Sequence, residues 1–278
     1  MNHAGHRHKK SLGQHFLHER GVVERILAAL APQPEQRVVE IGPGAGALTL
    51  PLLDRIGRLT AIEFDRDLLP RLTEAARGRG ELNLIHADVL TVDFTALAAG
   101  GRLRLVGNLP YNLSSPILFH CLAHLPAIED MHFMLQREVV ERMAAAPGSK
   151  VYGRLSVMIQ AECQVTPLFD VAPGAFKPPP KVDSAVVRLR PLAAGTAAVA
   201  DPKRFAEVVR SAFGQRRKTL RNALHGVCSV AEIEAADIDP GARAETISVA
   251  GFLRLAAPGP QPDPRAADPE PDPHDGGR

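Results

Sequence analysis

The sequence predicts an α/β fold in which a mostly parallel sheet lies between two layers of helices. Five short runs rich in branched apolar residues recur about every 20 to 28 positions, and helix-like segments separate them. Strands that alternate with helices are typical of parallel sheets covered on both faces. The chain has 278 residues and is 45% apolar, which is enough for one sizeable core and a small second domain.

The predicted strands are 37–42, 58–65, 82–88, 102–108 and 131–136.

Helices are expected between them at 67–78 and at 114–125. In the second helix Ser115 suits the N-cap and Pro116 suits the first helical position.

The pattern changes after residue 150. Segments 163–171 and 184–191 predict an antiparallel pair that closes the sheet. The segment 193–202 is a linker by composition. A helix with one apolar face follows, formed by Phe205, Val208, Val209, Ala212 and Phe213.

Five segments result: a basic arm (1–10), an α/β domain (11–192), the linker (193–202), a helical domain (203–256) and a proline- and acid-rich tail (257–278). The tail holds five acids and two arginines, so it carries −3 and the rest of the chain carries +5. A tail of this composition buries too little apolar surface to fold. The basic body fits a phosphate-rich partner, but it also fits many ordinary proteins.

Three widely spaced cysteines argue against a disulfide framework and a structural zinc site, and favour reduced, buried thiols. No stretch resembles a signal peptide or is long enough to span a membrane. A cytoplasmic protein is expected.

A glycine-rich turn, EIGPGAG (40–46), follows the first strand. Gly42 and Gly44 let the backbone approach a ligand while helix amides point at it. The G-x-G-x-G spacing differs from the G-x-G-x-x-G of dinucleotide-binding folds. A tight turn, or a site for another nucleotide, explains this loop equally well.

Two acids stand at the ends of the next two strands. Glu63 lies 21 residues after Gly42, close to the spacing of an acid that binds ribose hydroxyls, and Asp88 ends the third strand. Two carboxylates suit a ligand with ribose hydroxyls, an adenine amine and a positive charge, as in S-adenosylmethionine, better than a pyrophosphate. Each acid alone also suits a strand-end cap. Asp65 and Asp67 are expected to face solvent.

The fourth strand ends in N-L-P-Y (108–111). A nucleobase amine is a poor nucleophile because its lone pair is delocalised into the ring. The Asn108 side-chain oxygen and the Leu109 carbonyl provide two acceptors for its hydrogens, and Pro110 fixes the turn. The Tyr111 ring stacks on the base, worth ~1–3 kcal/mol, or is a packing residue. This pattern predicts methyl transfer by positioning, without a metal.

Motifs along the chain together resemble the ribosomal RNA adenine dimethyltransferase family. They include KKSLGQHFL, VEIGPGAGALT, GNLPYN, MHFMLQREVVERM, YGRLSVM, FKPPPKVDSAVVRL and FGQRRKTLRN. The resemblance implies a class I methyltransferase domain with a mostly parallel seven-stranded sheet and a small helical C-terminal domain. It implies S-adenosylmethionine as cofactor and, as target, two adjacent adenines in the 3′-terminal hairpin of 16S rRNA. The setting would be an immature small subunit, and the enzyme a monomer that contributes to small-subunit biogenesis.

The resemblance also assigns cofactor contacts. By motif these are Gly42, Glu63, Asp88 and Asn108, together with His15 and Leu17 on an N-terminal loop that closes over the cofactor. The family commonly has asparagine where His15 stands.

The resemblance further implies that Phe176 sandwiches the target base opposite Tyr111, although a core position suits Phe176 equally well.

A basic cluster lies in FGQRRKTLRN. Arg210, Arg217 and Arg221 are spaced as one stripe of a helix, beside Arg216 and Lys218. Such a cluster binds RNA phosphates or is a solvated helix face, and the family resemblance favours RNA.

Two alternatives remain open: a related methyltransferase that acts on large-subunit rRNA, and a non-catalytic assembly factor of the small subunit. An intact N-L-P-Y turn argues against the second. A NAD-dependent dehydrogenase is disfavoured by the missing G-x-G-x-x-G.

Overall fold

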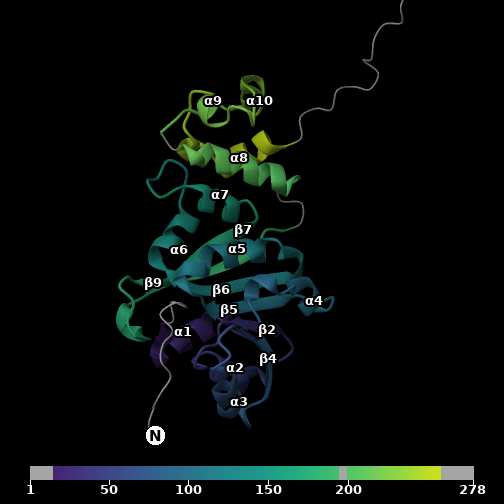
Figure 1. Ribbon diagram of the computed structural model, residues 1–278, viewed down its shortest axis with the longest axis vertical. Coiled ribbons are helices and arrows are strands. Elements are labelled where there is room, and N and C mark those ends of the chain that lie inside the picture. The colour runs from purple at the N-terminus through teal and green to yellow at the C-terminus, as the bar shows by residue number, and fades with distance from the viewer. Residues whose placement is uncertain (1–14, 194–198, 216, 258–278) are drawn as a thin grey trace, which may run out of the picture.

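The computed structural model describes residues 15–193, 199–215 and 217–257, and it has the predicted fold class (Figure 1). The large sheet consists of β2 (Arg37–Ile41), β3 (Arg58–Glu63), β4 (Glu81–His86), β5 (Leu103–Asn108), β6 (Ile128–Gln136), β7 (Cys163–Val171) and β9 (Ser184–Pro191). Their order across the sheet is β4-β3-β2-β5-β6-β9-β7, in which β9 pairs antiparallel with β6 and with β7. A two-stranded antiparallel sheet joins β1 (Phe16–Leu17) to β8 (Phe176–Lys177).

Helices cover both faces of the large sheet. The described helices are α1 (Arg20–Leu30), α2 (Thr49–Ile56), α3 (Leu69–Ala76), α4 (Phe94–Ala98), α5 (Ser114–Leu122), α6 (Arg137–Ala144), α7 (Arg154–Gln160), α8 (Pro202–Gly214), α9 (Leu220–Ala223), α10 (Val230–Ala235) and α11 (Val249–Ala256). α1 and α2 share a core with one face of the sheet, and α4, α5 and α6 share a core with the other. Across the described ranges, no helix is long and apolar enough to cross a membrane.

The order of the strands reverses between β2 and β5. The chain builds β2, β3 and β4 outward in one direction, then returns to place β5 on the other side of β2. β2 and β5 are parallel, with Glu40 opposite Val106. Ligands bind at such a reversal, outside the carboxyl ends of the strands. The turns that follow β2 and β5 therefore lie side by side: a Cβ added to Gly42 would lie 3.9 Å from the Asn108 carbonyl oxygen.

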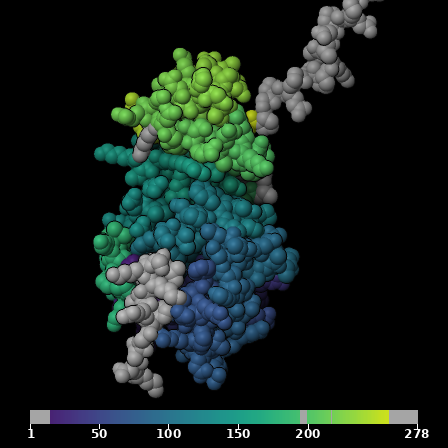
Figure 2. Space-filling model, viewed as in Figure 1, coloured from purple at the N-terminus to yellow at the C-terminus, as the bar shows by residue number. Residues whose placement is uncertain are grey.

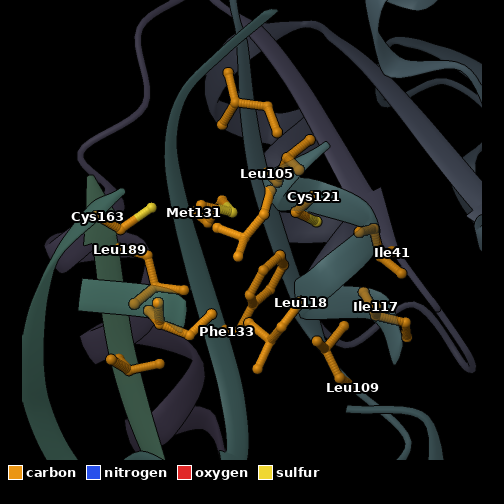
Figure 3. Packing of buried hydrophobic residues seen from close by; sticks show 14 of the residues in the cluster. Ile41, Leu105, Leu109, Ile117, Leu118, Cys121, Met131, Phe133, Cys163 and Leu189 are labelled. Atoms are coloured by element: carbon orange, nitrogen blue, oxygen red, sulfur yellow. The ribbon is translucent and has the colours of Figure 1, made fainter. Parts of the chain in front are cut away.

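The core under this edge is shown in Figure 3. Leu118 of α5 packs with residues of the central strands such as Leu105 and Phe133. Ile41, Leu109 and Ile117 extend the same cluster to the carboxyl edge of the sheet. Close-packed apolar residues thus fix the backbone from which the turns emerge.

The start of α5 differs from the prediction. A 3-10 turn, η3 (Tyr111–Leu113), leads directly into the helix, so Leu113 rather than Ser115 is the N-cap. The hydroxyl of Ser114 donates to the Pro110 carbonyl at 3.1 Å and ties the helix to the turn after β5. β6 also begins three residues before the predicted strand.

The C-terminal helices form a second core, at one end of the molecule in Figure 2 (green to yellow). The apolar face predicted for α8 is confirmed, with Phe205, Val208, Val209 and Ala212 buried and Phe213 half-buried against the same cluster.

Helix α7 belongs to both cores. Val157 packs in the C-terminal cluster, whereas Leu155 and Ile159 pack against the sheet. Just before α7, the buried Tyr152 donates its hydroxyl proton to the Ile247 carbonyl at 2.9 Å.

The three cysteines, Cys121, Cys163 and Cys228, are free and buried, as predicted. Burial raises the pKa of the Cys163 thiol to about 12, so this thiol stays protonated at neutral pH.

A buried polar group lies at the start of β6. Arg104 and Asp130 form a bidentate ion pair with N–O distances of 2.9 and 2.7 Å. The imidazole of His132 is 1% exposed, and its Nδ1 lies 3.8 Å from Asp130. Burial is the main cause that lowers the pKa of His132 to about 4.

Replacement of His132 by phenylalanine should reduce the loss of folding stability that the wild type shows as the pH falls below about 6.5. The unfolded chain takes up a proton at His132 near pH 6.5, whereas the folded protein takes it up near pH 4. Stability is therefore lost as pH falls from 6.5 to 4, by about 3 kcal/mol for this group. Denaturant unfolding of wild type, His132→Phe and the exposed control His225→Gln measures this. Parallel profiles for wild type and His132→Phe would contradict the assignment.

Candidate active site

A cavity of about 240 Å³ opens at the carboxyl edge of the sheet, where the strand order reverses. β1, the turns after β2 and β5, and the ends of β3 and β4 contribute its walls. Ten of the residues predicted for the site line it: His15, Leu17, Gly42, Gly44, Glu63, Asp88, Asn108, Leu109, Pro110 and Tyr111. The structure thus brings together residues spread over nearly a hundred positions of sequence.

Two glycines of the loop line the cavity, and the backbone there requires glycine. Gly42 and Gly44 have φ angles of +68° and +56°, in the left-handed region that side chains disfavour. A Cβ on Gly44 would also lie 3.0 Å from two ring carbons of Phe16, which packs on the loop. The loop is a tight turn, but it also forms a wall of the cavity under a strand from the N-terminus.

Glu63 braces this loop. One carboxylate oxygen accepts from the Gly44 amide at 3.1 Å, and the other accepts from the Asp65 amide at 2.8 Å. The residue is 6% exposed, and burial raises the pKa of its carboxyl group. A carboxylate has about four acceptor positions, and backbone amides do not occupy all of them, so Glu63 has the capacity to accept a ligand hydroxyl as well.

The other acids of the edge lie in different surroundings. Asp88 is exposed at the cavity, where its Oδ1 accepts from the Leu90 amide at 3.0 Å and caps η2 (Val89–Thr91). Asp67 is exposed, as predicted. The prediction that Asp65 faces solvent is wrong: it is 2% exposed, and its Oδ1 accepts from the Asp67 amide at 3.2 Å. The chain doubles back after β3, and Asp65 closes that turn.

Asn108 connects the turn after β5 to the N-terminal segment. Its Nδ2 donates to the His15 carbonyl at 2.9 Å, so its Oδ1 is the acceptor that the amide retains. The amide of Leu109 donates to the Met134 carbonyl of β6 at 3.1 Å. Both residues are thereby fixed at the end of the sheet.

The Tyr111 ring is held at two points. Its hydroxyl lies 2.6 Å from the Ser184 hydroxyl, and burial raises the pKa of the phenol. The His15 ring stacks on it, with centroids 5.6 Å apart and planes 29° apart. The Nδ1 of His15 lies 2.8 Å from the Pro178 carbonyl, which accepts its proton. His15, the residue that departs from the common family pattern, therefore contacts the turn after β5 through its ring.

Phe176 does not line the cavity. It is 2% exposed on β8 and pairs with Leu17 of β1 in the core. The sequence left a core position and a stacking position open, and the structure shows the core position. His15, instead, is the ring that stacks on Tyr111.

The predicted stripe of basic residues on one helix is wrong. α8 carries Arg210 but ends at Gly214, so Arg217 and Lys218 lie in a turn and Arg221 lies on α9. The predicted Arg216 lies outside the described residues, as do the arm 1–10 and residues 258–278 of the tail.

All four described basic residues of this group are exposed. An isolated bridge between Thr219 and Arg243 adds a further exposed arginine beside this turn, which sequence spacing did not reveal.

Among the lining residues that were not predicted from the sequence, two bear on ligand binding. Phe64 is 59% exposed at the cavity, although it directly follows a buried strand. The sequence pattern alone would place an apolar residue at this position in the core. Glu40 is 2% exposed in the cavity wall. A lone acid within the apolar run RVVEIG was the signal that could have identified it.

The donor set fits the predicted cofactor. A cationic nucleoside suits this cavity. The cavity offers two acids at strand ends, a glycine loop that leaves space for a ligand, and a largely apolar lining with an exposed aromatic ring. A dinucleotide would bring a pyrophosphate next to Glu63 and Asp88, which like charge disfavours.

Comparisons with known proteins agree with this chemistry. A family model described as Ribosomal RNA adenine dimethylase matches residues 5–257. Ribosomal RNA small subunit methyltransferase A of Xanthomonas campestris pv. campestris (strain B100) is 66% identical over 248 residues, which cover 89% of this chain and 95% of the relative.

Two solved structures are also similar. A dimethyladenosine transferase from Plasmodium falciparum has a TM-score of 0.76 at 26% identity, with 87% of this chain and 96% of that chain covered. The 23S rRNA methyltransferase ErmE has a TM-score of 0.65 at 30% identity, with 87% and 98% covered.

Replacement of Gly44 by alanine should damage the cavity beyond ordinary backbone strain. The positive φ alone costs roughly 1–2 kcal/mol of folding free energy. The contact with Phe16 should also push β1 off the loop and weaken S-adenosylmethionine binding, about tenfold in calorimetry. Gly226→Ala is the matched control, because Gly226 has φ +79° and no atom within 4 Å of the added Cβ. Equal cofactor affinity in the two variants would contradict this role of the Phe16 contact.

Proposed function

Since the chain belongs to the ribosomal RNA adenine dimethylase family and is an S-adenosylmethionine-dependent rRNA methyltransferase, we propose that it acts on small-subunit rRNA. Its targets are the N6 amines of two adjacent adenines in the 3′-terminal hairpin of 16S rRNA. The observation that carries the proposal is the turn after β5, where Asn108, Leu109 and Tyr111 line the cofactor cavity.

The relatives support the small subunit over the large one. The chain is 66% identical to the small-subunit enzyme over a region that covers 95% of that protein, whereas it is 30% identical to the 23S rRNA methyltransferase. A non-catalytic assembly factor would not need acceptors and an aromatic ring at the cavity.

The cofactor side of the cavity is formed by the glycine loop and the two acids. We assign the ribose hydroxyls to Glu63 and the adenine side to Asp88, with Phe64 as an exposed ring against the nucleoside. Gly42 and Gly44 leave room for the amino-acid portion. Bound here, S-adenosylmethionine supplies a methyl group on a sulfonium.

The substrate side is formed by the turn after β5. The Asn108 Oδ1 and the Leu109 carbonyl accept the two hydrogens of the adenine amine and orient its lone pair. Both oxygens stabilise the positive charge that develops on nitrogen. Tyr111, fixed by Ser184 and backed by His15, offers its remaining face to the base, and such stacking is worth ~1–3 kcal/mol.

RNA docking is assigned to a basic corner of the helical region, defined as Arg210, Arg217, Lys218, Arg221 and Arg243. The backbone holds this corner in shape: the Lys218 amide donates to the Gln215 carbonyl at 2.8 Å, and the Arg221 amide donates to the Pro240 carbonyl at 3.0 Å. We propose that residues 203–256 dock rRNA while residues 11–192 carry out methyl transfer. We also propose a cytoplasmic monomer that acts on the immature small subunit.

Incubation with labelled S-adenosylmethionine and unmethylated small subunits tests the function. The expected product is N6-dimethyladenosine at two adjacent positions of 16S rRNA. Label in 23S rRNA, or no label, would overturn the proposal.

In the same assay Asn108→Ala should lower methyl transfer by two or more orders of magnitude, because it removes one acceptor of the amine. Cofactor affinity, measured by calorimetry, should change much less. Asn112→Ala is the matched control, since Asn112 is exposed four residues further on. Turnover of Asn108→Ala equal to that of the control would exclude Asn108 from catalysis.

Neutralisation of the basic corner should weaken RNA binding without affecting the cofactor. The double variant Arg217→Ala/Arg221→Ala removes two phosphate contacts, so the slope of log affinity against log salt should fall by up to about 2. Filter binding to unmethylated subunits at several salt concentrations measures this, with the exposed Arg58→Ala/Arg77→Ala on β3 and after α3 as the control. An unchanged slope would show that the corner is a solvated surface.

A further inference from the structure

Glu40 is a buried carboxyl group in the cavity wall, and it has no role in the proposed methyl transfer. It lies on β2, two residues before Gly42, and is 2% exposed. The hydroxyl of Thr49, also buried, donates to its Oε2 at 2.6 Å. Thr49 is the first residue of α2, so this contact joins the strand to the helix that follows the glycine loop.

The surroundings of Glu40 favour a neutral carboxyl. Burial is the largest cause that raises its pKa to about 8, and the Thr49 hydrogen bond opposes it only in part. The nearby negative charge of Glu63 raises it further.

Few other charges face Glu40. Beyond Glu63 on β3, the titratable groups of the cavity are Asp88 after β4, His15 beside β1 and the Tyr111 phenol after β5. From α2 the charged groups lie elsewhere: Arg55, in the last turn, pairs with Glu24 of α1. On β5 the neighbouring Arg104 pairs with Asp130. No cation of the described residues is thus paired with Glu40.

We propose that Glu40 holds a proton while the cavity is empty and releases it when the cationic methyl donor binds. The inference rests on the assignment of S-adenosylmethionine as cofactor. In this step the O–H bond of the Glu40 carboxyl breaks and the proton leaves to solvent, with no redox change. The ionised carboxylate then faces the positive charges of the ligand in a site of low dielectric, where such attraction is strong.

Glu40 thereby distinguishes the methyl donor from the spent cofactor. S-adenosylmethionine carries a sulfonium and an ammonium, whereas S-adenosylhomocysteine carries a neutral thioether and an ammonium. Without the sulfonium charge, the ionised carboxylate of Glu40 is less stable, so Glu40 takes a proton back. The product then binds less tightly and exchanges more readily for a new methyl donor. Glu40 is a specificity residue in this view and does not touch the transferred methyl.

Calorimetry in two buffers of different ionisation enthalpy counts the protons released on binding. At pH 7 the wild type should release close to one proton with S-adenosylmethionine and clearly less with S-adenosylhomocysteine. The affinity for S-adenosylmethionine should rise up to tenfold per pH unit from pH 6 to pH 7 and level off above pH 8, because binding requires the ionised carboxyl.

Two variants isolate the group. Glu40→Gln keeps the Thr49 hydrogen bond but has no proton to lose, so its proton release and its pH dependence should vanish, and its preference for S-adenosylmethionine over the product should fall. Thr49→Val removes the hydroxyl that stabilises the ionised carboxylate of Glu40. The pH at which the affinity for S-adenosylmethionine stops rising should therefore be higher in this variant. Glu63→Gln, in contrast, should retain proton release, which separates the two carboxyl groups.

Undiminished proton release by Glu40→Gln, or wild-type binding without any proton release, would overturn the proposal and leave the enzyme assignment intact. Failure of the wild type to bind S-adenosylmethionine would instead remove the cofactor assignment itself.

Discussion

The parallel pairing of β2 with β5 is the constraint on which the site depends. The two strands come from different parts of the chain, and their register brings the glycine loop next to the turn that begins at Asn108. A slip of this register by one residue would turn every side chain of β5 to the opposite face of the sheet. The residues that fix the register are apolar and buried, such as Val106 and Leu105. Core packing thus determines where a cofactor can meet a base.

The N-terminal segment joins the two halves of this site. Phe16 lies on Gly44 of the glycine loop, while the His15 carbonyl accepts from Asn108 and the His15 ring stacks on Tyr111 of the turn after β5. Pairing of β1 with β8 anchors the segment to the loop before β9. His15 and the adjoining strand β1 (Phe16–Leu17) therefore contact both halves of the cavity, so these three residues link one half physically to the other.

The sequence was sufficient to locate the strands of the sheet and most residues of its carboxyl edge. Strand runs are strongly apolar, and acids or amides at their ends stand out against that pattern, as Glu63, Asp88 and Asn108 do. What sequence reasoning could not resolve was decided by contacts between distant segments. Phe176 is buried because β8 pairs with β1, and no local pattern records that pairing.

Chain reversals account for the other differences. Asp65 is buried because the backbone turns around it after β3. The basic stripe breaks because α8 stops at Gly214, and the chain then bridges through Thr219 to Arg243 instead of continuing as a helix. Helical periodicity correctly described the apolar face of α8 but carried no information about its end.

Helix α7 packs against both cores, with Leu155 and Ile159 against the sheet and Val157 in the C-terminal cluster. Just before it, Tyr152 adds a hydrogen bond to the Ile247 carbonyl within the C-terminal cluster. A hinge motion between the two cores would expose apolar surface of α7, so this packing favours a fixed distance between the carboxyl edge of the sheet and the C-terminal helices.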